Sequence, residues 1–241
     1  DIIIPGTPGG CIQFGTGEKE GKDQLNSILH KVKKAGIKKK YDVIVGLSGG
    51  TDSSFLLHKS IEWGLRPLAV HYDNTWNTAI ASENIRKITQ KLNVDLYTLI
   101  VDNNESNDIA RSFFYANVPE VDGPTDIALS ETLYRAASKF GIKYILEGHS
   151  FIEEGISPLS NAYIDGGYIK SVHKEFGSLK MKTFPNMTFF SFLKWVTIYR
   201  IKKIRPFWYI NYSKKEAKSI LKKEYDWKDY GGHHLENRLT A

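Results

Sequence analysis

The most informative segment of the sequence is a run of small and polar residues, Ser48-Gly49-Gly50-Thr51-Asp52-Ser53-Ser54. Two adjacent glycines let a ligand approach the backbone and expose successive N–H groups, while the serine hydroxyls can donate to phosphate oxygens. The carboxylate of Asp52 would repel a phosphate unless a cation lies between them, which points to Mg²⁺. The segment predicts a phosphate-binding loop, against the alternative of a tight turn followed by an Asp/Ser helix cap.

The position of this loop supports the same prediction. It lies between a short apolar run, Tyr41–Leu47, and a predicted helix, Ser53–Trp63. Open α/β sheets bind ligands beyond the carboxyl ends of their strands, where a helix N-terminus adds a partial positive charge. No lysine follows the glycines, so the segment is not the Gly-Lys-Ser/Thr loop of ordinary nucleotide triphosphatases.

A second polar group follows the next apolar run, which continues as Val70-His71-Tyr72-Asp73-Asn74-Thr75-Trp76-Asn77. The polar groups of Asp73 and Asn74 could face a ligand, although such residues also end strands in ordinary turns. A histidine in the position of His71 is more often packed in a core than bound to a ligand.

A third group, Glu147-Gly148-His149-Ser150, precedes Glu153-Glu154-Gly155. Glu147 and Glu154 could bind Mg²⁺, Glu154 could orient an amine, and His149 could donate to a phosphate; the alternative is a cap and a loop. Asp122-Gly123-Pro124-Thr125-Asp126 is a weaker signal, since it is equally a plain helix start.

The C-terminal run Tyr230-Gly231-Gly232-His233-His234-Leu235-Glu236-Asn237-Arg238 gathers polar groups behind a double glycine. Adjacent histidines point in different directions on a regular element, so a two-histidine metal site is poor. Arg238 can bind a diphosphate through two hydrogen bonds, and His233, His234 and Glu236 suit sugar hydroxyls. The alternative is a polar tail.

These groups need a framework, and the hydrophobic pattern supplies one. Apolar runs at Tyr41–Leu47, Leu68–Tyr72, Asp95–Val101 and Ile142–Glu147 alternate with segments of helical periodicity. The alternation predicts an α/β fold with a parallel sheet covered on both faces. We expect an irregular leader plus a helix over residues 1–40, the α/β domain over 41–155, and a mainly helical, acceptor-binding extension over 156–241. That extension could also pack on the same sheet.

Charge distinguishes the last part from the rest. Of the formal net charge of +6, residues Lys170–Glu224 carry 14 Lys/Arg against three Glu, and the segment is rich in aromatic residues. Such a segment fits nucleic acid, a membrane surface or an anionic small molecule, or simply an aromatic core face beside a solvated lysine face. The uncharged stretches after the N-terminus are too short to span a bilayer. The single cysteine, Cys11, excludes an internal disulfide framework, so the expected setting is the cytoplasm.

The loop resembles the pyrophosphate loop (PP-loop) of the N-type ATP pyrophosphatases, whose pattern is Ser-Gly-Gly-x-Asp-Ser. The resemblance covers residues 42–150 and implies cleavage of ATP between its α- and β-phosphates, with adenylation of a substrate oxygen. It also implies that the end of the second strand, near Val70, Asp73 and Asn74, lies by the nucleotide or the acceptor.

Together, the motifs resemble the N-acetyl sugar amidotransferases, the WbpG-like family within that superfamily. The resemblance implies an ATP- and Mg²⁺-dependent conversion of an acetamido group on a nucleotide-linked sugar into an acetamidino group, for bacterial surface polysaccharide. Glutaminase and cyclase-like partner subunits would supply ammonia. Many members carry paired Cys-x-x-Cys zinc knuckles; here Phe14 replaces the second cysteine after Cys11, which makes zinc doubtful.

The resemblance assigns roles as follows. Asp52, His149 and Glu154 would act in catalysis; Ser48, Gly49, Gly50, Thr51, Ser53, Ser54, Val70, Asp73 and Gly148 would bind ATP. Asn74, Thr75, Trp76, Asn77, His233, His234, Glu236 and Arg238 would bind the sugar nucleotide. The runner-up is a tRNA-modifying PP-loop enzyme of the lysine-ligating type, which the basic segment would suit. A non-catalytic binding module is a third reading. Nucleic acid is the less favoured partner, and a homodimer is left open.

Overall fold

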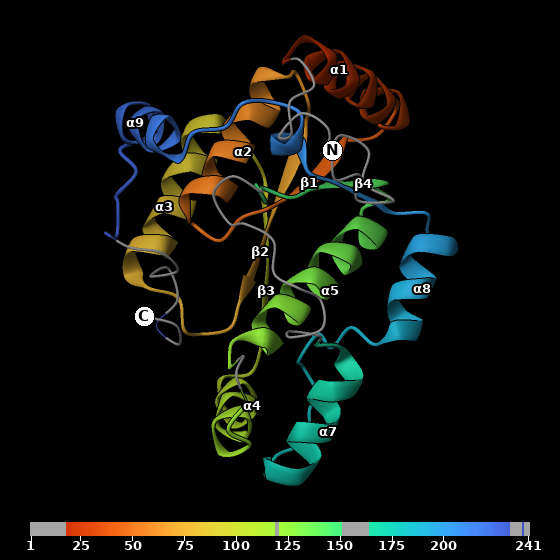
Figure 1. Cartoon of the computed structure of the whole chain (residues 1–241), viewed down its shortest axis with the longest axis vertical. Coiled ribbons are helices and arrows are strands. Elements are labelled where there is room, and N and C mark those ends of the chain that lie inside the picture. Colours follow the sequence, from red (N-terminus) through yellow and green to blue (C-terminus); the bar gives the residue numbers. More distant parts are fainter. Residues whose placement is uncertain (1–17, 119–120, 151–163, 232–237, 239–241) are drawn as a thin grey trace.

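The computed structural model describes residues 18–118, 121–150, 164–231 and 238. Its centre is a five-stranded, entirely parallel sheet in the order β3-β2-β1-β4-β5 (Figure 1). The strands are β1 (Val43–Gly46), β2 (Pro67–Asp73), β3 (Leu96–Ile100), β4 (Tyr144–Leu146) and β5 (Lys202–Ile204). The α/β fold with a parallel sheet that the sequence predicted is confirmed.

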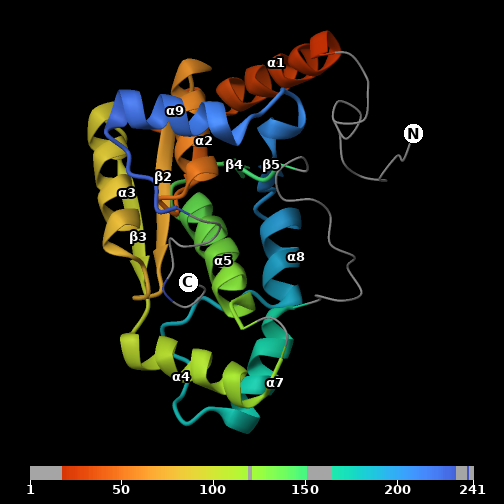
Figure 2. The ribbon, with the colours of Figure 1, turned by 60° about the vertical axis from the view of Figure 1, so that its left-hand side comes forward.

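The two faces of the sheet are covered by different helices because successive strand residues point to opposite sides. Val43 and Val45 of β1 pack with α1 (Glu18–Ala35), α2 (Thr51–Glu62), α3 (Ala79–Leu92) and α9 (Lys214–Tyr225). Ile44 points the other way and packs with α5 (Gly123–Lys139) and α8 (Phe189–Thr197). Figure 2 shows the two helical layers on either side of the strands.

A third cluster of apolar residues lies at one end of the sheet. There α4 (Asn103–Tyr115) and α7 (Gly166–Phe176) contact each other below the strand ends (Figures 1 and 2). Two carboxylates of α4 hold the segment that follows α7: Glu105 accepts from the backbone of Lys182, Thr183 and Phe184, and Asp108 accepts from Ser178 and Leu179. The hydrophobic pattern had not predicted α4.

The C-terminal extension is not separate from the α/β domain, because it contributes a strand to the same sheet. β5 pairs with β4 at the sheet edge, followed by the 3₁₀ turn η2 (Pro206–Trp208) and α9. Phe207, Trp208 and Leu221 are buried in the core that β1 and α2 also form. The extension therefore places residues next to the strand ends where the loop lies. No helix among the described residues is long and apolar enough to cross a membrane.

Candidate functional site

The Ser48–Ser54 loop leaves the carboxyl end of β1 and opens α2, whose first residue is Thr51. Gly49 has φ +86°, and a Cβ there would lie 2.4 Å from the carbonyl oxygen of Ala81 in α3. Only glycine fits this conformation and this close approach. The first glycine of the pair is therefore required by the packing of the loop against α3.

Serine hydroxyls hold the loop in shape. The backbone N–H of Ser48 donates to Oγ of Ser53 at 3.2 Å, the two hydroxyls lie 3.0 Å apart, and the N–H of Gly50 donates to Oγ of Ser48. Ser54, in contrast, is fully buried, and its hydroxyl has no hydrogen-bond partner among the described residues. Ser48 and Ser53 are thus in place to meet phosphate oxygens, whereas Ser54 faces the interior.

The carbonyl of Gly49 is held by two side chains that sequence reasoning did not identify. Trp227 donates from Nε1 at 3.2 Å and Asn84 donates from Nδ2 at 3.3 Å. Asn84 is fully buried and also exchanges two hydrogen bonds with the backbone of Lys228. Nothing in the local sequence signals this contact, because it joins α3 to a segment that follows α9.

A cavity of about 480 Å³ opens beside the loop. Its walls come from the loop and the start of α2, from residues 126–133 of α5, from the end of β4, and from α9 and the residues after it. The lining side chains that can form hydrogen bonds or carry charge are Ser48, Thr51, Asp52, Ser53, Asp126, Ser130, Glu147, His149, Lys214, Lys218 and Tyr230. The first and third polar groups of the sequence therefore meet in one hollow.

Asp52 is paired with the C-terminal extension. Its Oδ2 lies 3.2 Å from Nζ of Lys214, and its Oδ1 accepts a hydrogen bond from the hydroxyl of Tyr212. Ser213 caps the N-terminus of α9 by accepting a hydrogen bond from the N–H of Glu216. This cap fixes the backbone next to Lys214, the first residue of the helix. The loop lacks the lysine of ordinary nucleotide triphosphatases, and α9 brings Lys214 and Lys218 to the same cavity.

Glu147 is neutralised by the strand next to it. Lys203 of β5 lies 2.5 Å from Oε1, and Arg205 lies 3.2 Å from Oε2. Burial opposes ionisation, but the two cations hold the pKa of Glu147 below its ordinary value. In this structure Glu147 binds β5 to the end of β4.

The Gly148-His149 pair lies where the sequence placed it, at the carboxyl end of β4. A Cβ on Gly148 would come 3.1 Å from the carbonyl of Asp52, so the glycine allows the β4 end to approach the loop. His149 lines the cavity, and its ring lies edge-on to Trp208 with centroids 6.3 Å apart. An imidazole at this point can reach a phosphate bound by the loop.

The turn after β2 is held by its own side chains. Asp73 accepts from the N–H of Thr75 and from Asn77, and Asn74 accepts from the N–H of Trp76. These bonds support Thr75 at φ +69°, an unusual conformation for a β-branched residue. Asn74 is buried, and the strand-ending turn considered from the sequence describes both Asp73 and Asn74 well.

Two other residues of this strand are engaged within the fold. The carbonyl of Val70 accepts from the N–H of Leu47 at 2.8 Å. His71 is buried and donates from Nδ1 to the carbonyl of Leu47, and burial lowers its pKa. It is a packed core histidine, as its type and position favoured.

Arg238 joins the last motif to this turn. Its backbone N–H donates to the carbonyl of Trp76 at 2.8 Å, and its side chain is exposed. Tyr230 and Gly231, at the start of the same motif, line the cavity. The indole Nε1 of Trp76 is buried without a hydrogen-bond partner among the described residues, which leaves a donor for a ligand. Cys11, Glu154, His233, His234 and Glu236 lie outside the described residues.

The donor set suits a magnesium ion only together with phosphates. Among the described residues, no three His, Cys, Asp or Glu side chains gather into a metal site. Mg²⁺ that arrives with a triphosphate needs only one or two protein carboxylates besides phosphate oxygens and water. Asp52, at the mouth of the loop, meets that requirement.

The sheet is parallel in the order β3-β2-β1-β4-β5, and the Ser48–Ser54 loop lies at the carboxyl end of its central strand, β1. No family model matches the sequence. The chain is 32% identical over 129 residues to an uncharacterised protein, MJ1599, of Methanocaldococcus jannaschii; the match covers 53% of this chain and 44% of that relative. The chain thus spans less than half the length of this relative.

Among solved structures, the chain is similar to NMN synthetase from Francisella tularensis, with a TM-score of 0.43, 13% identity and coverage of 88% and 94% of the two chains. It is also similar to NH₃-dependent NAD synthetase from Campylobacter jejuni, with a TM-score of 0.42 and 16% identity; the match covers 66% of this chain and 73% of that one. A third similar structure is U34-tRNA thiolase NcsA from Methanococcus maripaludis, with a TM-score of 0.47 and 14% identity; the match covers 91% of this chain and 69% of that one. Similarity at this level carries no argument about function, which must come from the site.

Proposed function

We propose that this protein is an ATP-dependent amidotransferase of the PP-loop type that acts on a nucleotide-linked N-acetyl sugar. One arrangement supports the proposal: the Ser48–Ser54 loop lines a cavity together with Lys214 and Lys218 of α9, and the backbone of Arg238 is hydrogen-bonded to Trp76 in the turn after β2. The first part suits ATP. The second part suits a separate acceptor.

ATP would bind with its β- and γ-phosphates in the loop. The N–H groups at the start of α2 and the hydroxyls of Ser48 and Ser53 would donate to phosphate oxygens. Lys214 and Lys218 of α9, which line the same cavity, would supply positive charge. Mg²⁺ bound with ATP would neutralise the phosphates further, held partly by Asp52, and Lys214 would then be released from Asp52 toward the phosphates.

The reaction has two steps. The acetamide oxygen attacks the α-phosphorus of ATP, forming an O–P bond and releasing pyrophosphate. Ammonia then attacks the imidate carbon, the C–O bond to AMP breaks, and loss of a proton from nitrogen leaves the amidine. An amide oxygen is a very poor leaving group and AMP is a good one, so adenylation makes the exchange feasible. Positioning and charge neutralisation would supply most of the rate.

The acceptor would lie between the cavity and the β2 turn. Arg238 has an exposed guanidinium, suited to a diphosphate through paired hydrogen bonds. The buried indole N–H of Trp76 can donate to a sugar oxygen. His233, His234 and Glu236 belong to this proposed acceptor site by sequence, and Glu154 would orient the incoming amine.

Ammonia would come from a partner subunit. Cys11 lies in a Gly/Pro-rich segment, an unsuitable setting for the cysteine nucleophile with which a glutaminase releases ammonia. A glutaminase with its cyclase-like subunit would release ammonia close to the cavity and shield it, since free ammonia is mostly protonated at neutral pH.

The test is to incubate the purified chain with ATP, Mg²⁺, ammonium and a panel of nucleotide-linked N-acetyl sugars. We expect AMP, pyrophosphate and a sugar whose mass shows NH in place of O. Glutamine should not replace ammonium for the lone chain, and should do so once the glutaminase is added. If AMP formed with lysine and tRNA and with none of the sugars, the proposal would be wrong. The protein would then be a tRNA-modifying enzyme, the alternative that the basic segment would suit.

A further inference from the structure

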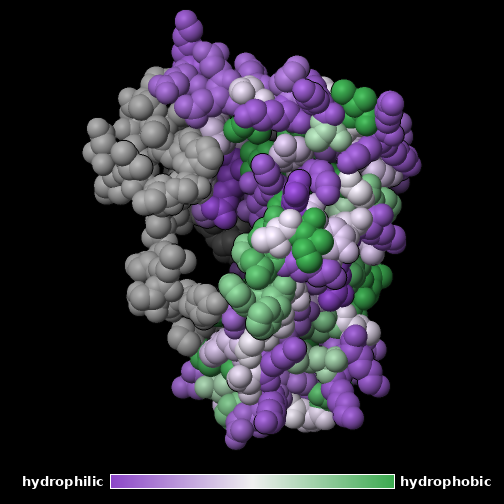
Figure 3. All heavy atoms as spheres, turned by 90° about the vertical axis from the view of Figure 1, so that its right-hand side faces the viewer, coloured by the Kyte–Doolittle hydropathy of each residue, from purple (hydrophilic) through white to green (hydrophobic). Residues whose placement is uncertain are grey.

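The helix α8 carries its large apolar residues on the outside. Phe189, Phe190, Leu193 and Ile198 are 60%, 79%, 42% and 73% exposed, within and just after a helix of nine residues. Figure 3, in which this side of the molecule faces the viewer, shows apolar atoms grouped over its middle, with hydrophilic residues around them. Soluble proteins rarely expose such a group of large apolar side chains unless something covers it.

The helix is nevertheless firmly seated. Trp195 is buried, stacks on Tyr134 of α5, and donates from Nε1 to the buried carboxylate of Glu131 at 2.8 Å. Thr188 caps the helix by accepting from the N–H of Ser191. Trp195 thus fixes α8 on α5, helped by the ring of Phe192, which lies edge-on to Tyr134 at 6.2 Å, whereas Phe189 and Phe190 do not contribute to the core. Their exposure is a built feature of the fold.

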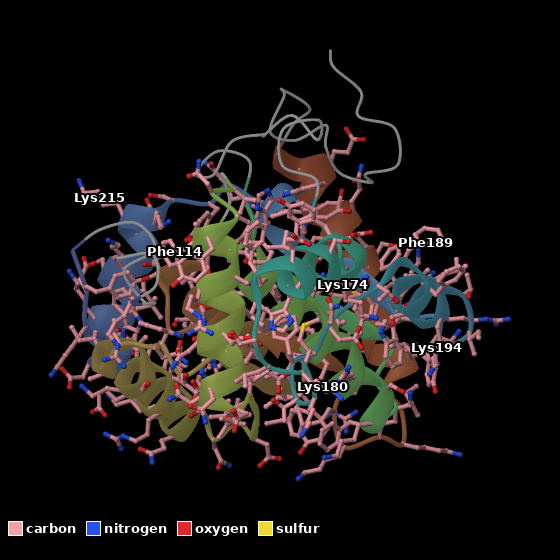
Figure 4. The ribbon with its side chains drawn as sticks, turned by 90° about the horizontal axis from the view of Figure 1, so that it is seen from below. Phe114, Lys174, Lys180, Phe189, Lys194 and Lys215 are labelled. Atoms are coloured by element: carbon pink, nitrogen blue, oxygen red, sulfur yellow. The ribbon has the colours of Figure 1, made fainter. Side chains whose placement is uncertain are left out.

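Positive charge surrounds this apolar face. From Lys170 to Arg200 the sequence has six Lys/Arg and one acid, Glu175. Lys194 on α8 and Arg200 just after it are exposed. Lys174 on α7 and Lys180 in the segment that follows α7 are exposed as well. Figure 4 shows Phe189 and Lys194 on the same side of the molecule, opposite Phe114 and Lys215.

We propose that the outer face of α8 docks on an anionic lipid bilayer. The phenylalanines and Ile198 would enter the boundary between headgroups and acyl chains, and the surrounding lysines and arginine would bind acidic headgroups. Reversible peripheral binding needs an apolar signal and a basic one together, and this face has both. A second copy of the chain fits less well, because a two-fold contact through this face would bring like charges together.

The geometry leaves the cavity free when the protein is docked. Leu133 and Ser130 of α5 line the cavity, whereas Glu131 and Tyr134 of the same helix contact Trp195. α5 therefore separates α8 from the cavity, and loss of the α8 apolar side chains should not disturb nucleotide binding.

The experiment is co-sedimentation of the full chain with vesicles of phosphatidylcholine alone and with vesicles that also contain phosphatidylglycerol. We expect sedimentation with the anionic vesicles only, and a decline as salt is added. The double substitution Phe189→Gln/Phe190→Gln should weaken binding tenfold or more, roughly the loss of two partly inserted rings. Lys194→Gln with Arg200→Asn should weaken it about fivefold per charge; asparagine tolerates the φ of +53° at Arg200.

A matched control is available on the opposite side. Phe114 and Tyr115 at the end of α4 are 57% and 66% exposed, so Phe114→Gln/Tyr115→Gln removes two largely exposed rings outside the basic segment. This variant should sediment as the unaltered protein does. Absence of binding to anionic vesicles would overturn the proposal. So would self-association in light scattering that the α8 variant abolishes, which would assign the face to a second copy.

Discussion

The backbone N–H of Arg238 donates a 2.8 Å hydrogen bond to the carbonyl oxygen of Trp76, which ties the last described residue to the turn after β2. The bond belongs to the backbone, so it survives a change of side chain. Removal of the Arg238 guanidinium therefore tests that group alone, with the course of the chain preserved.

Arg238→Ala should raise the KM for the nucleotide-linked sugar much more than the KM for ATP. A lost two-bond contact to a diphosphate costs on the order of 2 kcal/mol, or roughly thirtyfold. Steady-state kinetics with each substrate varied in turn measure the split. Equal effects on both constants would place Arg238 at the ATP site or in the fold, and unchanged constants would remove it from the site.

Asp52→Ala should abolish pyrophosphate release while the fold stays intact, because Asp52 is at the cavity and not in the core. Thermal unfolding checks the fold, and pyrophosphate release checks the reaction. Ser54→Ala is the matched control in the same helix, since that hydroxyl is buried and absent from the cavity wall. Normal turnover by Asp52→Ala would show that the carboxylate has no part in handling the metal–phosphate group.

The parts of the site that the sequence predicted are those set by local signals. The Ser48–Ser54 loop follows an apolar run and precedes a helix, and the Gly148-His149 pair follows another such run, so both could be placed at strand ends. A parallel sheet brings its carboxyl ends to one edge, which is why the cavity contains both groups.

The parts that could not be predicted depend on β5. Its three residues, Lys202–Ile204, include one apolar side chain, too little for a strand signal. Its placement beside β4 nonetheless brings Lys203 and Arg205 to Glu147 and leads the chain to Lys214 beside Asp52. Contacts between residues this far apart in sequence can be predicted only when the topology of the sheet is known. The same holds for Trp227 at the carbonyl of Gly49.

Lys214→Met should raise the KM for ATP and lower kcat, by roughly tenfold or more, because a partly buried charge beside the phosphates would be lost. Lys215→Met is the matched control. Lys215 is the next residue of α9, is exposed, and lies at the periphery in Figure 4. Kinetics of AMP formation by both variants make the comparison. Equal behaviour of the two would mean that the general charge of the extension matters and the pairing with Asp52 does not.

Acid should weaken the fold through Asp108. Burial opposes the ionisation of this carboxyl group. Hydrogen bonds from the backbone N–H groups of Leu179 and Ser178, and from Arg111 and His173, nevertheless lower its pKa to about 2 from an ordinary 3.8. A carboxyl whose pKa is lower in the folded state stabilises the fold above its unfolded pKa, and that contribution is lost as the pH falls through the folded pKa. Asp108 should therefore add about 2 kcal/mol at neutral pH, lost between about pH 4 and pH 2.

Denaturant unfolding of Asp108→Asn at a series of pH values measures this contribution. The variant should be less stable at neutral pH by at least that amount, since asparagine cannot accept from all of these donors, and its stability should fall less steeply below pH 4 than that of the unaltered protein. Asp226→Asn is the control: Lys87 also lowers the pKa of Asp226, but that side chain is 79% exposed, so water screens the pair and the cost should be small. Parallel pH curves for the unaltered protein and Asp108→Asn would show that the carboxylate does not bind the segment after α7 as strongly as its four partners imply.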